Sequence, residues 1–292
     1  MVSLSQQLFL GIDGGGSKCK ARLENAQGEL LGEGLSGPAN PLRGIEQTTT
    51  SILDATQQAL AEAGLNDASL AHIYAGIGLA GVNIPAYRQL VQNWQHPFAQ
   101  MYVATDLHIA CLGAHDGGDG AVIIAGTGSS GVSVIQGEYF EMGGHGFGVG
   151  DKGSGAWLGL TAVSKTLEAL DDIGISTPLV EKVMQHLQVD CAHTLVEQIT
   201  GKSPAFFAKL SPVVVEMANQ QDPLALSIVR DGADYLNRMA RRLLANKPPR
   251  FSMIGGVAQH IQKWMDDEVT QRISPTIHPP EIGAILLARS LV

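Results

Sequence analysis

The sequence predicts an α/β protein built from two related domains, and three observations lead to this prediction. The chain opens with an apolar run, a glycine turn and a second apolar run between Leu8 and Leu23. The same order of strand, turn and strand returns between Ala121 and Ile135. Between these hairpins, apolar segments of strand length alternate with segments of helical periodicity. A repeated unit in a chain of 292 residues is typical of two domains.

Composition favours a large folded core. Apolar residues make up 45% of the chain and charged residues 16%, which argues against disorder. The net charge of −9 argues against a nucleic-acid-binding or anionic-membrane-binding surface. The three cysteines are scattered and odd in number, so we expect reduced thiols in a cytoplasmic protein. We expect neither a signal peptide nor a transmembrane helix, since no apolar run approaches roughly 20 residues.

The first hairpin carries a carboxylate, Asp13, at the end of its first strand. Glycine and polar residues follow it: Gly14, Gly15, Gly16, Ser17 and Lys18. Consecutive N–H groups in such a turn bind anions, and a carboxylate beside them can hold a Mg²⁺ ion that accompanies phosphate. The spacing differs from that of a P-loop and of a dinucleotide-binding loop. A phosphate-binding hairpin and a purely structural hairpin, with Asp13 as a turn cap, both fit these residues.

Beyond the hairpin, the first half alternates strands and helices. A third strand is expected at Glu29–Glu33, and Gly37–Pro41 is expected to form a loop. The next elements are expected at residues 45–63 (helix), 71–77 (strand), 85–94 (helix), 101–104 (strand) and 107–114 (helix). The polar, glycine-rich segment 115–120 then marks a boundary between domains at 1–117 and 118–292.

The second half repeats the opening order and then departs from it. After the strand–turn–strand unit at 121–135, a helical insertion is expected at about 155–247. A late strand at 250–254 ends at Gly255-Gly256, and residues 280–292 form a terminal helix that could return to the first domain.

These hairpins and the late strand ending in Gly-Gly resemble the actin-like ATPase and sugar kinase superfamily. The closer resemblance is to its amino-sugar branch, the N-acetylglucosamine and glucosamine kinases grouped with the BadF/BcrA-type ATPases. The matching segments, in family order over essentially the whole chain, are GIDGGGSK at 11–18, GPAN at 37–40, AGIGLAG at 75–81, TD at 105–106, AGTGSS at 125–130, GGHGFGVGDKGSG at 143–155, IGGV at 254–257 and EIGAILLA at 281–288. The resemblance implies two ribonuclease-H-like domains around a central cleft, with ATP between the two hairpins.

The resemblance also implies a nucleotide site. Asp13 would lie on the Mg²⁺ side of the phosphates. The residues expected to bind ATP are Gly14, Gly15, Gly16, Ser17, Lys18, Thr127, Gly128, Ser129, Gly255 and Gly256. The last two would let the adenosine lie against backbone, although a Gly-Gly pair is also a common structural turn.

Asp106 is the candidate catalytic base. It follows an apolar strand, at the edge where open α/β sheets bind their ligands. A carboxylate there could orient the sugar 6-hydroxyl and accept its proton during phosphoryl transfer. An N-cap for the helix that begins nearby fits the same residue locally.

The residues expected to bind the sugar follow from the resemblance: Asn40, Asp106, Thr127, Gly144, His145 and Asp151. His145 departs from the family pattern and would otherwise be a surface loop residue. Lys152 departs as well, because relatives commonly carry an acidic or amide residue there. An ammonium group beside Lys152 would be repelled, which favours a neutral acetamide on the sugar.

The function expected from these residues is ATP-dependent phosphorylation of N-acetylglucosamine at its 6-hydroxyl, with Mg²⁺. Glucosamine kinase on the same scaffold is the alternative function. The protein could also form a homodimer. An ATPase that activates a partner enzyme would use cluster-binding cysteines, which the scattered thiols argue against. A non-catalytic sugar sensor would be expected to lose Asp13 or Asp106, and both are present.

Overall fold

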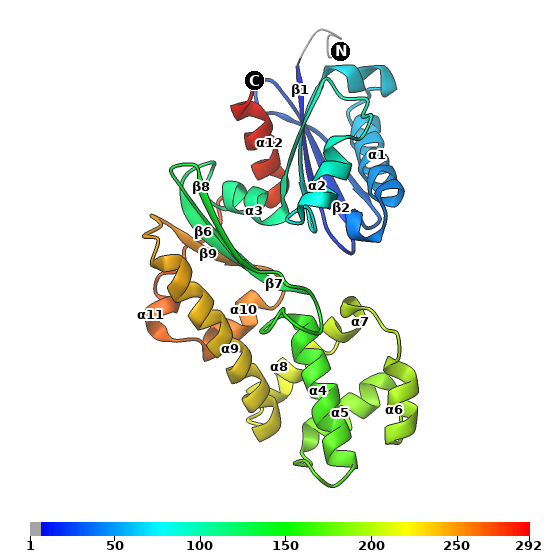
Figure 1. Ribbon diagram of the computed structural model, residues 1–292, viewed down its shortest axis with the longest axis vertical. Helices are drawn as coiled ribbons and strands as arrows, with labels where there is room; N and C mark the ends of the chain where they lie inside the picture. The colour runs from blue at the N-terminus through cyan, green and yellow to red at the C-terminus, as the bar shows by residue number, and fades with distance from the viewer. Residues whose placement is uncertain (1–6) are drawn as a thin grey trace. The chain divides into compact units, whose positions relative to one another are not determined.

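The computed structural model describes residues 7–292, which divide into two compact units (Figure 1). The first unit contains the chain up to Gly120 together with Pro275–Val292, and the second contains Ala121–Ser274. The first six residues of the predicted first domain lie outside the described residues. No helix of residues 7–292 is long and apolar enough to cross a membrane.

The first unit is built on a five-stranded sheet in the order β3-β2-β1-β4-β5. Its strands are β1 (Leu8–Gly14), β2 (Cys19–Asn25), β3 (Leu30–Ser36), β4 (Ile73–Leu79) and β5 (Gln100–Thr105). The first three pair antiparallel, whereas β4 and β5 run parallel to β1. The carboxyl ends of β1, β4 and β5 therefore meet at one edge of the sheet.

Helices cover both faces of this sheet because side chains of β1 alternate between two cores. Leu10 and Ile12 pack with α1, while Phe9 packs with the terminal helix α12. Glycine allows the closest approach: a Cβ at Gly11 would lie 1.9 Å from the Glu281 carbonyl oxygen of α12. The helices of the unit are α1 (Ile45–Glu62), α2 (Pro85–Gln92), α3 (Asp106–Ala114) and α12 (Pro280–Ser290), with short 3₁₀ turns η1 (Pro41–Arg43) and η2 (Asp67–His72).

The second unit is built on a four-stranded sheet in the order β8-β7-β6-β9. Its strands are β6 (Gly120–Ala125), β7 (Ser129–Ile135), β8 (Glu138–Gly143) and β9 (Phe251–Ile254). β9 runs parallel to β6, and β8 pairs antiparallel with β7. Helices occupy the chain between β8 and β9, and β8 is an additional strand that the sequence pattern did not indicate.

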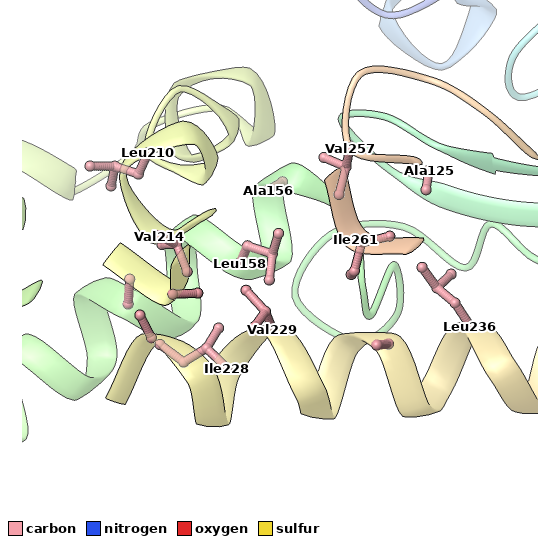
Figure 2. Packing of buried hydrophobic residues seen from close by; sticks show 14 of the residues in the cluster. Ala125, Ala156, Leu158, Leu210, Val214, Ile228, Val229, Leu236, Val257 and Ile261 are labelled. Carbon is pink, nitrogen blue, oxygen red and sulfur yellow. The ribbon is translucent and has the colours of Figure 1, made fainter. Parts of the chain in front are cut away.

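The helices of the second unit form its main core. They are α4 (Gly155–Leu170), α5 (Pro178–Leu187), α6 (Ala192–Ile199), α7 (Pro204–Ala208), α8 (Ser211–Asn219), α9 (Pro223–Leu244), α10 (Ala258–Ile261) and α11 (Asp267–Thr270), with η3 (Gln262–Trp264). Figure 2 shows Val229 and Leu236 of α9 pointing towards α4 and α10. This packing holds α9 against α4 and α10.

Candidate active site

Asp13 and Asp106 lie at the same edge of the first sheet. Asp13 is the penultimate residue of β1, and Asp106 directly follows β5. Across β4, Gly14 is level with Leu79, and Leu79 is level with Thr105. The fold therefore brings together two carboxylates that are far apart in the sequence, at the edge where parallel sheets bind ligands.

The surroundings of Asp13 raise the pKa of its carboxyl group from 3.8 to about 6. Burial is the largest cause, and the negative charges of Asp106 and Glu281 act in the same direction. The positive charges of Lys18 and Lys20 lower the pKa and oppose these effects in part. An ionised Asp13 is therefore repelled by neighbouring carboxylates, and a bound cation would relieve that repulsion.

The glycine turn after β1 is closed by a hydrogen bond from the N–H of Gly15 to the carbonyl of Lys18, at 2.9 Å. None of the three glycines adopts a left-handed backbone, so the backbone conformation does not itself require glycine here. A Cβ at Gly14 would lie 2.4 Å from a leucine side chain of β4, whereas a Cβ at Gly16 would meet no atom within 4 Å. Ser17 and Lys18 are exposed, which leaves the tip of the turn open to a ligand.

The loop that contains Asn40 is fastened to this turn. The N–H of Ala39 donates to the Gly15 carbonyl at 2.9 Å. Asn40 caps the short helix η1, and its Oδ1 accepts from the N–H of Leu42 at 3.0 Å. Because this oxygen is used within the loop, the side-chain amide nitrogen is the group left to donate to a ligand.

The N-cap of α3 is Thr105, so the interpretation of Asp106 as the cap is wrong. Thr105 Oγ1 accepts from the N–H of His108 at 3.1 Å. Asp106 is the first residue of the helix, and its Oδ1 accepts from the N–H of Leu107 at 3.0 Å. A carboxylate in this first turn is stabilised in its charged form by the helix dipole.

In the second unit, the turn after β6 and Asp151 lie against each other. Asp151 is 9% exposed, and the backbone N–H groups of Ser129 and Gly146 donate to its carboxylate. A Cβ at Gly128 would lie 2.9 Å from Oδ2 of Asp151, so glycine leaves the room that this carboxylate needs. Burial raises the pKa of Asp151, while the two donors and the charge of His145 oppose the rise.

Gly255 and Gly256 lie at the same sheet edge as Thr127, because β9 runs parallel to β6. Gly255 has a φ of 108°, and a Cβ there would lie 2.5 Å from the carbonyl oxygen of Ala125. Gly256 has no atom within 4 Å of its Cβ position, and both glycines and Thr127 are exposed. The backbone at this edge is therefore open to a ligand.

Three further predicted residues of the second unit differ in their exposure to solvent. The side chain of Ser129 is buried, and its hydroxyl donates to the carbonyl of Lys152 at 2.9 Å, so it holds the loop that contains Asp151. Gly144 and His145 are exposed, on the same loop.

In the structure, Lys152 is not the unpaired positive charge that was expected to repel an ammonium group on the sugar. Lys152 Nζ lies 2.6 Å from Oδ1 of Asp231 on α9 and 5.3 Å from the ring centroid of Trp157. The charge is thus paired with a carboxylate that is distant in the sequence. Lys152 therefore gives no ground for preferring a neutral sugar.

Sequence reasoning also missed Glu281, at the start of α12. Its carboxylate is 3% exposed and lies 2.6 Å from Lys20 Nζ. Lys20 is the partner of Asp13 in the β1–β2 ladder, so the ion pair lies beside the predicted metal residue. The only sequence signal was a carboxylate within an otherwise apolar helix, EIGAILLA.

The donor set fits a magnesium ion that is bound partly by nucleotide. Within residues 7–292, no group of three or more His, Cys, Asp or Glu side chains is arranged to hold a metal. Mg²⁺ in phosphate-transfer sites usually takes one or two carboxylates, several waters and the phosphates themselves. Asp13, with Asp106 near enough to shift its pKa, would supply such a carboxylate.

Comparisons with known proteins agree with this architecture. The chain is 35% identical over 280 residues to the glucosamine kinase GspK of Vibrio cholerae, which covers 96% of this chain and 95% of that protein. It is 25% identical over 316 residues to the N-acetyl-D-glucosamine kinase of Dictyostelium discoideum, covering 98% of each chain.

A solved structure from Chromobacterium violaceum, described as a candidate N-acetylglucosamine kinase, superposes with a TM-score of 0.91 at 30% identity, over 97% of this chain and 99% of that one. The predicted fold class, the α/β fold of the actin-like sugar kinases, is confirmed. The model of the BadF/BadG/BcrA/BcrD ATPase family matches residues 10–288, and the chain belongs to that family.

Proposed function

We propose that this protein is an ATP-dependent amino-sugar kinase that phosphorylates N-acetylglucosamine at its 6-hydroxyl. The observation that carries the proposal is the pair formed by Asp13 and Asp106, at the carboxyl edge of three parallel strands and beside an open glycine turn. The relatives reported above are named as kinases of N-acetylglucosamine or glucosamine, which supports the choice of substrate class.

In the proposed reaction, Asp106 acts as general base. The 6-hydroxyl oxygen attacks the γ-phosphorus, the new O–P bond forms, and the bond to the leaving ADP oxygen breaks. The proton of the hydroxyl passes to the carboxylate of Asp106, the first residue of α3. Phosphoryl transfer depends mainly on orientation and charge stabilisation, so one base and well-placed donors are sufficient.

The nucleotide side of the site uses the other residues. We assign Asp13 as the residue that would hold Mg²⁺, which when bound neutralises phosphate charge. The exposed tip of the turn, with Lys18, would face the phosphates. Thr127 and the open backbone at Gly255 and Gly256 would contact the nucleotide from the second unit's sheet edge.

On the sugar side, we assign Asn40 and Asp151 as hydrogen-bonding residues, with Gly144 and His145 near the amino substituent. Asp151 is held by two backbone donors, so its carboxylate is oriented before the sugar binds. A cytoplasmic location is part of the proposal, because an exposed free thiol at Cys191 fits a reducing compartment.

Glucosamine is the second candidate substrate, and two observations support it. The ion pair between Lys152 and Asp231 removes the unpaired positive charge that would have repelled an ammonium group. The relative that is 35% identical is a glucosamine kinase. Both sugars therefore have to be compared directly.

A coupled ADP-release assay tests the proposal. Purified protein with Mg²⁺ and ATP is offered N-acetylglucosamine, glucosamine, glucose or N-acetylmannosamine. We expect the highest kcat/KM with N-acetylglucosamine. A higher value with glucosamine would mean that the protein is an amino-sugar kinase whose preferred substrate is glucosamine. ADP release that no sugar stimulates would refute the kinase proposal.

A further inference from the structure

The chain segment that follows Asp151 is fixed to helix α9 at two consecutive positions. Lys152 forms its ion pair with Asp231, at 2.6 Å. The next residue, Gly153, packs against Gly232, and a Cβ at Gly153 would lie 2.9 Å from the Gly232 carbonyl oxygen. Two neighbours in the loop thus meet two neighbours in the helix, so α9 determines where this part of the loop lies.

The attachment matters because Asp151 has an unusual backbone. Its φ is 59°, in the left-handed region that residues with a side chain rarely adopt. Such a conformation persists where surrounding contacts hold it. The N–H groups of Ser129 and Gly146 hold the Asp151 carboxylate. The backbone that follows Asp151 is held by the ion pair between Lys152 and Asp231 of α9.

We propose that Asp231 is a positioning residue for sugar binding, which acts through Lys152 to hold Asp151 in the conformation that presents its carboxylate to the substrate. This inference rests on the proposed function, in which Asp151 binds the sugar. Asp231 itself is about half exposed, so it is not expected to be important for global stability. We expect the loss of its charge to make only the loop that contains Asp151 less ordered.

The proposal predicts an effect confined to sugar binding. Replacing Asp231 with Asn keeps the shape of the side chain and removes its charge. We expect the sugar KM to rise about two- to fivefold, the range that a partly exposed ion pair provides. We expect kcat within about twofold of wild type and an unchanged KM for MgATP, since the proposed role of Asp231 is to hold the sugar-binding loop and not to bind nucleotide.

Two further variants provide the controls. Asp231→Glu keeps the charge and should restore the wild-type sugar KM. Glu168→Gln removes a similar partly exposed ion pair, between Lys165 and Glu168 at 2.7 Å within α4, and should leave the sugar KM unchanged. Thermal melting of each variant shows whether any change in KM accompanies a loss of stability.

Hydrogen exchange measured by mass spectrometry gives a readout that does not need activity. Peptides covering 144–154 should exchange faster in Asp231→Asn than in wild type or Glu168→Gln, with other peptides unchanged. Unchanged exchange in this segment would overturn the positioning role, as would an unchanged sugar KM in an active enzyme. If wild type shows no sugar-dependent ADP release, the proposed function fails alone, and the exchange result still decides whether Asp231 orders the loop.

Discussion

Replacing Asp13 with Asn should make the protein more stable at neutral pH while it weakens the use of MgATP. A carboxyl group whose pKa is about 6 in the folded state and 3.8 in the unfolded state binds its proton more tightly when folded. Below about pH 4 both states carry the proton, so the carboxyl group has no destabilising effect. As the pH rises through 6, the folded state must hold a buried negative charge beside Asp106 and Glu281, and stability is lost.

The size of this effect follows from the displacement of the pKa. At 1.36 kcal/mol for each pH unit, a rise from 3.8 to about 6 corresponds to about 3 kcal/mol of unfolding free energy. Asn has nearly the same shape and no charge, so Asp13→Asn should be more stable than wild type by up to about this amount at pH 7.5. The difference should shrink between pH 6 and pH 4 and vanish below pH 4.

The assay is urea unfolding of wild type and Asp13→Asn at pH 7.5 and pH 4, without Mg²⁺ or nucleotide. Calorimetry of ligand binding on the same proteins should show sugar affinity nearly unchanged and MgATP affinity lost in the variant. A variant that is less stable than wild type at pH 7.5, or whose advantage does not depend on pH, would refute the account of Asp13 as a charge held in a repulsive site. Loss of sugar affinity with nucleotide affinity kept would mean that the two ligand sites are reversed.

Three other predictions test separate parts of the structure. Asp106→Asn should lower kcat and kcat/KM by about 10²–10⁴-fold with little change in nucleotide affinity or melting temperature, because Thr105 caps the helix; a kcat within about threefold of wild type would contradict the role of general base. The kcat/KM for MgATP should fall as the pH drops through about 6, where Asp13 takes up its proton, and a profile flat from pH 8 to pH 5 would count against this. Gly11→Ala should destabilise the first unit by about 1–3 kcal/mol or more in denaturant unfolding, since its Cβ would lie 1.9 Å from the Glu281 carbonyl oxygen; wild-type stability would show that α12 can move aside.

Most strands and helices of the first unit could be predicted because their apolar periodicity is strong. The helix at 45–63 and the terminal helix are examples, and both end within one or two residues of the expected positions. β8 (Glu138–Gly143) was missed because it is an edge strand with largely exposed side chains, so no alternation of buried and exposed residues marks it.

The site was predictable where its residues follow strands or glycine turns, as Asp13 and Asp106 do. It was not predictable where the contact depends on chain segments that meet only in the fold. Glu281 reaches Lys20 from the opposite end of the sequence, and Asp231 pairs with Lys152 from a separate helix. A charge that looks unpaired in the sequence can thus be neutralised by a distant residue, which is why Lys152 gives no support for a neutral sugar.

Identifying the product made by wild type and by Asp106→Asn tests whether the protein is a sugar 6-kinase with Asp106 as its base. Each protein is incubated with ATP, Mg²⁺ and N-acetylglucosamine, ADP release is followed, and the sugar phosphate is examined by phosphorus NMR. We expect one product from wild type, with phosphorus coupled to the two protons on carbon 6, and a rate at least about 10²-fold lower from the variant. Phosphate on another oxygen, or equal rates for both proteins, would contradict this expectation.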